Sequence, residues 1–353
     1  MAESSGSIVA DTAARIFADL ADPQAVNRAK DDGWKPPLWT ALTEAGLPLA
    51  WVPDALGGSG AEIADGFAVL GVAGRYALAA PLSETLLAGW LLAGAGIAAP
   101  ATAMTVAPMR LHDRITLAAD GVLAGHASAV AFAAEAEHIA VLADSAKGPT
   151  VALVATRDCR LSQRRGTTDD GSAAIAFDGV TPLTHAPAGL DREALMLMGS
   201  VVRAVQTAGA LEAILAMSVA YANERVAFER PIGKFQAVQQ NLARLAGEVA
   251  AALAVSGSAA DAMAQAESID DAVFLEAASA KIRCAEAAQL GAAIAHQVFG
   301  AIGFTREHVL HRFTLRMLAW RDDFGNESHW AAELGRRVAA RGADEFWPVM
   351  ASR

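Results

Sequence analysis

Cysteine, aromatic residues and positive charge are all scarce in this chain of 353 residues. Two cysteines, Cys159 and Cys284, are too few for a disulfide scaffold or a cysteine-rich metal site. The chain carries 28 lysines and arginines against 39 aspartates and glutamates, a net charge of −11, and no basic run. Such a balance disfavours nucleic acid and anionic membrane surfaces as partners. We therefore expect no nucleic-acid partner, and the unpaired thiols favour a cytoplasmic location.

The hydrophobic fraction is high, at 54%, although only 6% of the residues are aromatic. Two stretches, residues 85–109 and 287–305, hold no charged side chain and are long enough to raise the question of a membrane span. Glycines and prolines interrupt the first, and glutamines and a histidine interrupt the second. We expect both to be buried segments and no membrane span. Residues 1–10 contain Glu3 and lack the pattern of a secretory signal.

The sequence changes character twice along the chain. Apolar residues at three- and four-residue spacing predict an N-terminal helical domain over residues 1–102. Short apolar runs between turn signals such as Asp120-Gly121 and Asp178-Gly179 predict a small antiparallel β-barrel or sandwich domain over residues 103–187. Residues 188–353 read as a helical bundle. Its expected helices cover residues 191–225, 235–265, 270–299, 308–321 and 327–340. The fold class is therefore α+β, mostly α.

Most candidate chemistry has a structural explanation. His308 and His311 lie three residues apart, which is not the four-residue spacing of a zinc peptidase, so no metal site is expected. The turn 57–60, Gly-Gly-Ser-Gly, has neither the context of a nucleophile elbow nor that of a dinucleotide-binding loop. Cys284, inside a helix, is most simply a structural thiol.

Two stretches carry more information. Residues 221–236 read Tyr-Ala-Asn-Glu-Arg-Val-Ala-Phe-Glu-Arg-Pro-Ile-Gly-Lys-Phe-Gln, which predicts a helix ending near Phe228, a turn and a new helix. Arg225 is either an ordinary polar helix residue or a residue whose guanidinium group binds a diphosphate through two parallel hydrogen bonds. Residues 296–305 read His-Gln-Val-Phe-Gly-Ala-Ile-Gly-Phe-Thr. This pattern is either a helix C-cap or a place where a ligand approaches the backbone.

Together the two stretches resemble the acyl-CoA dehydrogenase family, whose members carry Tyr-Ala-x-x-Arg-x-x-Phe-Gly-x-Pro-Ile-x-x-Phe-Gln and, about sixty residues later, Gln-x-x-Gly-Gly-x-Gly-Phe-Thr. The turn at residues 52–60 is similar to the family's Pro-Glu-x-x-Gly-Gly-x-Gly. The resemblance implies FAD-dependent oxidation of an acyl-CoA thioester to the 2,3-enoyl-CoA, in fatty acid or lipid catabolism. It also implies that FAD is shared across a subunit interface. The residues that would contact FAD are Arg225, Phe228, Gln236, Gln297, Gly300 and Ala301.

The chain departs from the family where the chemistry takes place. Phe324 stands where the resemblance puts the catalytic glutamate, and Val202 stands at the alternative position for the base. Asp322, Asp323 and Glu327 are the nearest carboxylates, and no catalytic residue is assigned. The polar β-domain segments that surround the flavin ring are also missing at residues 103–110 and 125–132.

Two hypotheses follow from these departures. The chain is a subunit of a homo- or hetero-oligomer of acyl-CoA dehydrogenase-like chains that oxidises an acyl-CoA. Alternatively, it is a catalytically silent subunit that completes a partner's FAD site.

Overall fold

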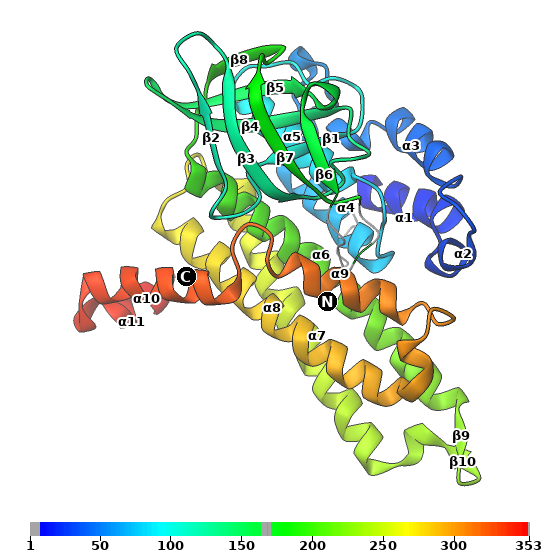
Figure 1. Cartoon of the computed structure of the whole chain (residues 1–353). Coiled ribbons are helices and arrows are strands. Elements are labelled where there is room, and N and C mark those ends of the chain that lie inside the picture. Colours follow the sequence, from blue (N-terminus) through cyan, green and yellow to red (C-terminus); the bar gives the residue numbers. More distant parts are fainter. Residues whose placement is uncertain (1–7, 164–167, 169–170, 352–353) are drawn as a thin grey trace.

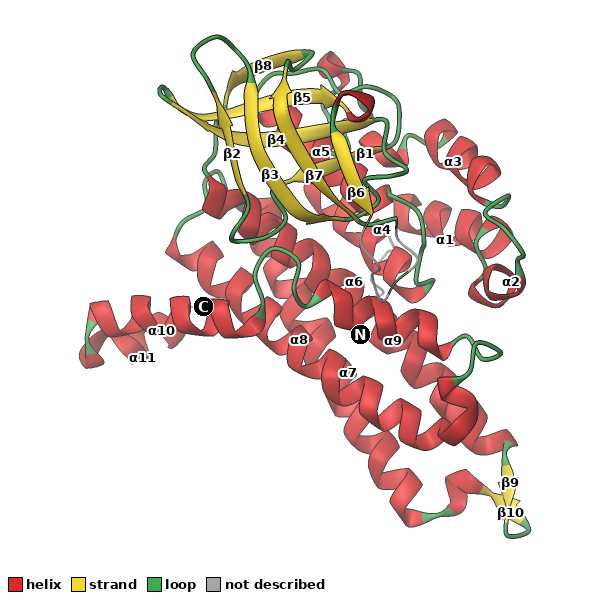
Figure 2. Cartoon of the chain, viewed as in Figure 1, coloured by secondary structure: helices red, strands yellow, loops and turns green. Residues whose placement is uncertain are grey.

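The structure is a computed structural model that describes residues 8–163, 168 and 171–351. Helices form both ends of the described chain and a curled sheet forms the middle, as the sequence predicts (Figure 1, Figure 2). The boundaries 102/103 and 187/188 stay predictions. The fold class itself is confirmed.

The N-terminal helices cover one side of the bundle. They are α1 (Ile8–Leu20), α2 (Pro23–Arg28), α3 (Lys35–Glu44), α4 (Ile63–Arg75) and α5 (Leu82–Gly94). Helix α4 approaches the bundle backbone to backbone, because a Cβ added at Gly209 would lie 2.1 Å from the carbonyl oxygen of Gly71. A Cβ at Gly74 would lie equally close to the carbonyl oxygen of Gln206. Glycine is required at this crossing, which fixes the N-terminal helices to the bundle.

The middle domain is one eight-stranded sheet in the order β6-β7-β3-β2-β4-β5-β8, with β1 also paired to β4. The strands are β1 (Met104–Ala107), β2 (Arg114–Leu117), β3 (Leu123–Val130), β4 (His138–Ser145), β5 (Gly148–Ala155), β6 (Arg160–Gln163), β7 (Ala173–Val180) and β8 (Thr184–Pro187). The turn signals favoured an all-antiparallel arrangement, but β1 and β2 each run parallel to β4. Parallel partners are joined through other elements, so the short turns between neighbours could not reveal them. Helix α5 covers β1, β4 and β5.

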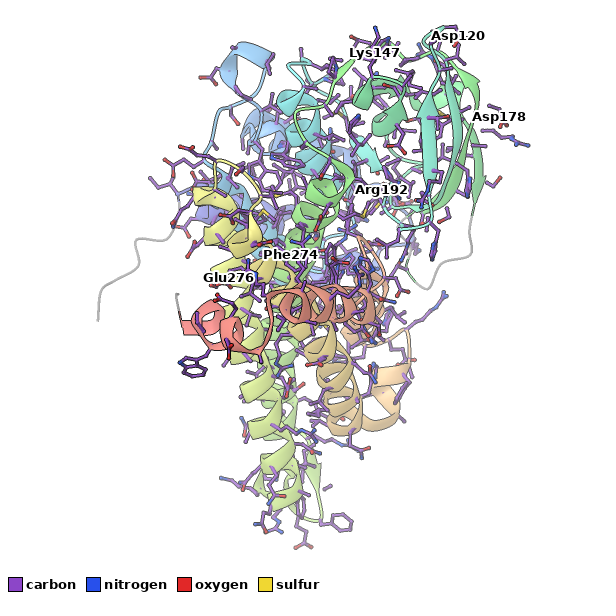
Figure 3. All side chains as sticks on the ribbon, turned by 90° about the vertical axis from the view of Figure 1, so that its left-hand side faces the viewer. Asp120, Lys147, Asp178, Arg192, Phe274 and Glu276 are labelled. Carbon is purple, nitrogen blue, oxygen red and sulfur yellow. The ribbon has the colours of Figure 1, made fainter. Side chains whose placement is uncertain are left out.

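Three long antiparallel helices form the bundle: α6 (Arg192–Glu224), α7 (Gln236–Gln265) and α8 (Asp271–Phe299). Asp191 begins α6 as predicted, with its carboxylate accepting from the amide of Ala194. Arg192 then donates to the carbonyl oxygens of Arg110 and Leu111 and joins the bundle to the β domain (Figure 3). Helices α9 (Leu310–Trp320), α10 (Glu327–Arg341) and α11 (Ala343–Ala351) complete the chain. The sequence did not predict α11.

All three long helices have the length and apolar composition needed to cross a membrane. Their surroundings in this fold differ. The most apolar window of α6 is entirely buried inside the protein, as expected for a helix that is hydrophobic on all sides. The corresponding window is half buried in α8 and only 28% buried in α7. Helix α7 therefore presents apolar surface that this chain does not cover. The absence of a membrane span stays a prediction.

The expected range 191–225 matches α6 to within one residue, whereas the end near Phe228 expected from the motif was one turn too late. The helix ends at Glu224, and a short hairpin follows, with β9 (Val226–Ala227) paired to β10 (Arg230–Pro231). Its two turn residues, Phe228 and Glu229, have φ of 51° and 65°. Hairpin turns whose two central residues both have positive φ favour the sequence Asn-Gly. The sequence Phe-Glu therefore gave no turn signal here. The hairpin lies at the far end of the bundle from the sheet (Figure 1).

Candidate functional site

The six residues predicted to contact FAD gather at the end of the bundle away from the sheet. This end is formed by the C-terminus of α6, the N-terminus of α7 and the C-terminus of α8. Tyr221 and Phe299 join the first and last of these helices, because their rings stack with centroids 4.5 Å apart. The Tyr221 hydroxyl also donates to the carbonyl oxygen of Phe299 at 3.4 Å. The two sequence motifs, sixty residues apart, therefore meet at one surface.

The side chains at this surface face outward. Arg225 caps α6 and is exposed, and Gln236 is the first residue of α7 and also exposed. Phe228 is 89% exposed at the tip of the hairpin. From the second motif, Gln297, Gly300 and Ala301 are exposed. Gly300 has φ +65°, which glycine adopts without strain. A cation, a long helix N-terminus and exposed amides suit a phosphate-bearing ligand.

The other sequence candidates have structural roles. His311 donates from Nδ1 to the carbonyl oxygen of His308, and no group of three or more His, Cys, Asp or Glu side chains in the described part could hold a metal. Burial raises the pKa of the Cys284 thiol to about 12, so this thiol is not a nucleophile. The Ser59 hydroxyl donates to the carbonyl oxygen of Gly46 and holds the 57–60 turn.

A buried ion network lies along the N-terminal half of α6, where the N-terminal helices, the bundle and the β domain meet. Arg203, 2% exposed, donates from Nη2 to Glu84 at 2.7 Å and from Nε to Asp323 at 2.9 Å. Its Nη1 donates to Gln206 at 2.8 Å and to Ser83 at 3.3 Å. Every guanidinium nitrogen thus has a partner, which a buried charge requires.

Phe324 lies beside this network with its ring fully packed. The residue is 1% exposed, and its ring fits over Gly199 so closely that a Cβ there would come within 2.3 Å of Phe324 Cγ. The Phe324 carbonyl oxygen accepts from Ser200 Oγ at 2.9 Å and from Trp330 Nε1 at 3.0 Å. Its amide donates to the carbonyl oxygen of Met109 at 2.8 Å. Side chain and backbone are therefore both fixed.

Lys281 holds the segment that carries Asp323 and Phe324. Its Nζ donates to the carbonyl oxygens of Trp320 at 2.7 Å and Asp323 at 2.8 Å. Burial lowers the pKa of Lys281 to about 7; Asp323 acts against this shift, while Arg203 and Arg110 add to it. The sequence gave one unused signal for this network: Glu84 and Arg203 are isolated charges within long apolar stretches.

A cavity of about 660 Å³ opens where the start of α6 faces the end of α7. Trp90, Met198 and Met263 line its apolar part. Its charged side chains are Asp191, Glu193, Glu267 and Arg337. Arg337 already pairs with Glu193, Asp271 and Glu333, so the rim is predominantly acidic.

Comparison with known proteins settles the family. The chain is 30% identical over 343 residues to the acyl-CoA dehydrogenase IpdE2 of Mycobacterium tuberculosis, covering 96% of both chains. The chain belongs to the acyl-CoA dehydrogenase family. The family model for the acyl-CoA dehydrogenase C-terminal domain matches residues 192–329, which include both flavin motifs. The resemblance seen in the sequence is thereby confirmed, and the relatives place this acyl-CoA dehydrogenase chain among the oxidoreductases.

Solved structures support the same conclusion. The ChsE4–ChsE5 complex of Mycobacterium tuberculosis is similar with a TM-score of 0.85 and 25% identity, covering 96% of this chain and 98% of the other. A variant of the Tcur3481–Tcur3483 steroid acyl-CoA dehydrogenase is similar with a TM-score of 0.82 and 25% identity, covering 94% and 97%.

Proposed function

We propose that this acyl-CoA dehydrogenase chain is one subunit of a hetero-oligomer that oxidises an acyl-CoA thioester to the 2,3-enoyl-CoA with FAD. In this proposal the chain contributes the exposed bundle end to an FAD held mainly by a partner subunit. The partner supplies the substrate pocket and the catalytic base. The closed environment of Phe324 is the single observation that carries the proposal.

A catalytic base is missing around Phe324 in this proposal. Asp323 accepts from Arg203 and also pairs with Arg110 at 3.1 Å, and Asp322 is exposed to solvent. Glu327 pairs with Arg321. Burial, the largest single effect, raises the pKa of Glu327, but the hydrogen bond and charge of Arg321, the backbone amide of Glu327 and the charge of Lys281 together lower it by more, so the net shift is downward. A general base must lie within hydrogen-bond distance of the proton that it removes. These carboxylates are instead engaged in ion pairs or exposed to solvent, so none of them is assigned as the base.

Contacts between the two segments expected to flank the flavin ring support the same proposal. The segment after β1 stands where the family resemblance puts one wall of the flavin-ring site. Here it contacts the Phe324 segment directly, through the Met109 carbonyl oxygen and through Arg110 with Asp323. In this proposal the two segments, joined by these contacts, do not hold the flavin ring. The acidic rim of the nearby cavity is also a poor match for the phosphates of coenzyme A, because like charges repel.

The bundle end, in contrast, fits the diphosphate and adenosine portion of FAD. Arg225 is exposed for a bidentate contact, the α7 N-terminus offers free amides, and Gln236 and Gln297 are exposed. When bound, FAD would accept the hydride, and the protein would position it. The uncovered apolar surface of α7 is consistent with a partner subunit beside this end. The similarity to the ChsE4–ChsE5 complex supports a heteromeric assembly.

Co-expression with a longer homologue that carries the family's glutamate tests the proposal. The chain purified alone should be colourless and inactive, and the co-purified complex should be yellow and bleach with an acyl-CoA. A matched complex whose partner subunit has that glutamate replaced by glutamine should be yellow but should not bleach. A yellow, acyl-CoA-reactive preparation of this chain alone would contradict the proposal and support a self-sufficient oligomer.

A further inference from the structure

Three histidines cluster beside the turn that carries the second flavin motif. The turn is the 3-10 helix η5 (Gly300–Phe304), which follows α8 directly. His296 comes from the last turn of α8, His308 from the segment after η5, and His311 from α9. The rings of His296 and Phe304 stack at 4.4 Å, and the rings of His308 and Phe299 lie at the same distance. The cluster therefore packs on residues at both ends of the turn.

The hydrogen bonds fix which nitrogen of His308 carries the hydrogen. Its Nδ1 accepts from the amide of Leu310 at 3.1 Å, so the neutral ring holds its hydrogen on Nε2. A second proton would have to enter at Nδ1. That proton would remove the acceptor of the Leu310 amide in the first turn of α9.

His296 is constrained in the same way. Its Nε2 lies 3.0 Å from Thr314 Oγ1, and in the protonated ring, where both nitrogens donate, Thr314 Oγ1 is the acceptor for Nε2. The remaining nitrogen, Nδ1, is buried and has no hydrogen-bond partner in the described part of the chain. A Cβ added at Gly303 would lie 3.2 Å from this atom, so it faces the backbone of η5. A proton there would be a buried donor without an acceptor, and leaving such a group unsatisfied is costly.

The surroundings also disfavour added positive charge. Burial lowers the pKa of both imidazoles, and electrostatic repulsion by His311 lowers each of them further. The other charged and titratable groups on the elements around the cluster are Tyr221 and Glu224 of α6, Arg28 of α2, Arg306 and Glu307 after η5, and Arg312 and Arg316 of α9. Burial and His311 account for the lowered pKa values of the two imidazoles.

We propose that His296 and His308, beside His311, form an acid-sensitive latch that holds η5 in place while these two imidazoles are neutral and releases it when they are protonated. The stabilisation by His296 and His308 is fully present above about pH 6.5 and is lost as the pH falls through their lowered pKa values. Because η5 carries Gly300 and Ala301, acid would also weaken the flavin contact. This last step rests on the proposed function.

Amide hydrogen exchange of the full chain tests the latch without flavin. Protection of residues 300–305, corrected for intrinsic exchange rates, should fall at least about tenfold between about pH 8 and about pH 5. The double variant His296→Gln, His308→Asn keeps hydrogen-bonding groups near the same positions but cannot titrate, so its protection should change less than about twofold. His329→Gln is the matched control, because the pKa of His329 is also lowered but this residue lies on α10. It should behave as the wild type.

Equal protection of the wild type at both pH values would overturn the latch, and so would an equal loss in the double variant. If the double variant does not fold, proton titration of the wild-type imidazoles replaces it. The loss of protection must then follow the titration of His296 and His308. A second arm measures flavin release from the co-purified complex on acidification. Complexes that never hold flavin, together with the expected exchange result, would support the latch and contradict the proposed function.

Discussion

Replacing Phe324 by alanine should destabilise the chain strongly and create no activity. The ring is buried, rests directly on Gly199, and lies beside the Arg203 network, with the guanidinium carbon 5.9 Å from the ring centroid. Gly199 has no side chain with which to fill the space, so a cavity should remain. Truncation of a buried phenylalanine that leaves a cavity costs about 3–5 kcal/mol.

That cost can be converted into a shift of the melting temperature. An unfolding entropy of about 2.1 cal/mol/K per residue gives roughly 0.7 kcal/mol/K for a chain of 353 residues. Phe324→Ala should therefore lower the melting temperature by about 4–7 °C if the chain unfolds cooperatively. Scanning calorimetry measures this, with Phe228→Ala as the control. Phe228 is 89% exposed, so its truncation should cost no more than about 0.5 kcal/mol. A shift of Phe324→Ala as small as that of the control would refute the view that this ring closes the site.

Two further predictions concern the buried network and the exposed bundle end. Arg203→Met should cost about 3–5 kcal/mol, because it leaves the carboxylates of Glu84 and Asp323 buried without their main donor. Adding Glu84→Gln should recover part of that loss in a double-mutant cycle, and strictly additive melting shifts would count against the network. Arg225→Ala should lower the FAD content of the co-purified complex by at least about tenfold, since it removes a charge-assisted contact. The exposed Arg157→Ala should leave the absorbance at 450 nm unchanged, and an equal flavin loss in both variants would count against the role of Arg225.

The sequence predicted the order of the three regions and the long bundle helices well, because these depend on local signals. Apolar periodicity and the N-caps Asp191 and Asp270 mark the starts of α6 and α8 within one residue. The parallel pairing of β1 and β2 with β4 could not be predicted, because pairing between distant strands leaves no local pattern. The hairpin at Phe228 and Glu229 was missed because neither residue type favours a left-handed turn.

The candidate site was also predictable only where it depends on local sequence patterns. The motif residues were identified from their pattern, and their contact with FAD stays a prediction. The ion network of Arg203 was not anticipated, since it joins Glu84 to Asp323, which lie far apart in the sequence. The close packing of Phe324 on Gly199 is likewise a long-range contact. Sequence reasoning could note that phenylalanine cannot accept a proton, but not that the ring fills its site.

Bleaching of the flavin by an acyl-CoA in complexes with one altered subunit tests the central claim most directly. The account predicts that replacing the partner subunit's glutamate by glutamine abolishes bleaching completely, while Phe324→Ala in this chain leaves a stable fraction of the complex able to bleach. Residual bleaching near half of the original amplitude, with the partner's glutamate removed, would show that this chain carries a catalytic site of its own and would contradict the account.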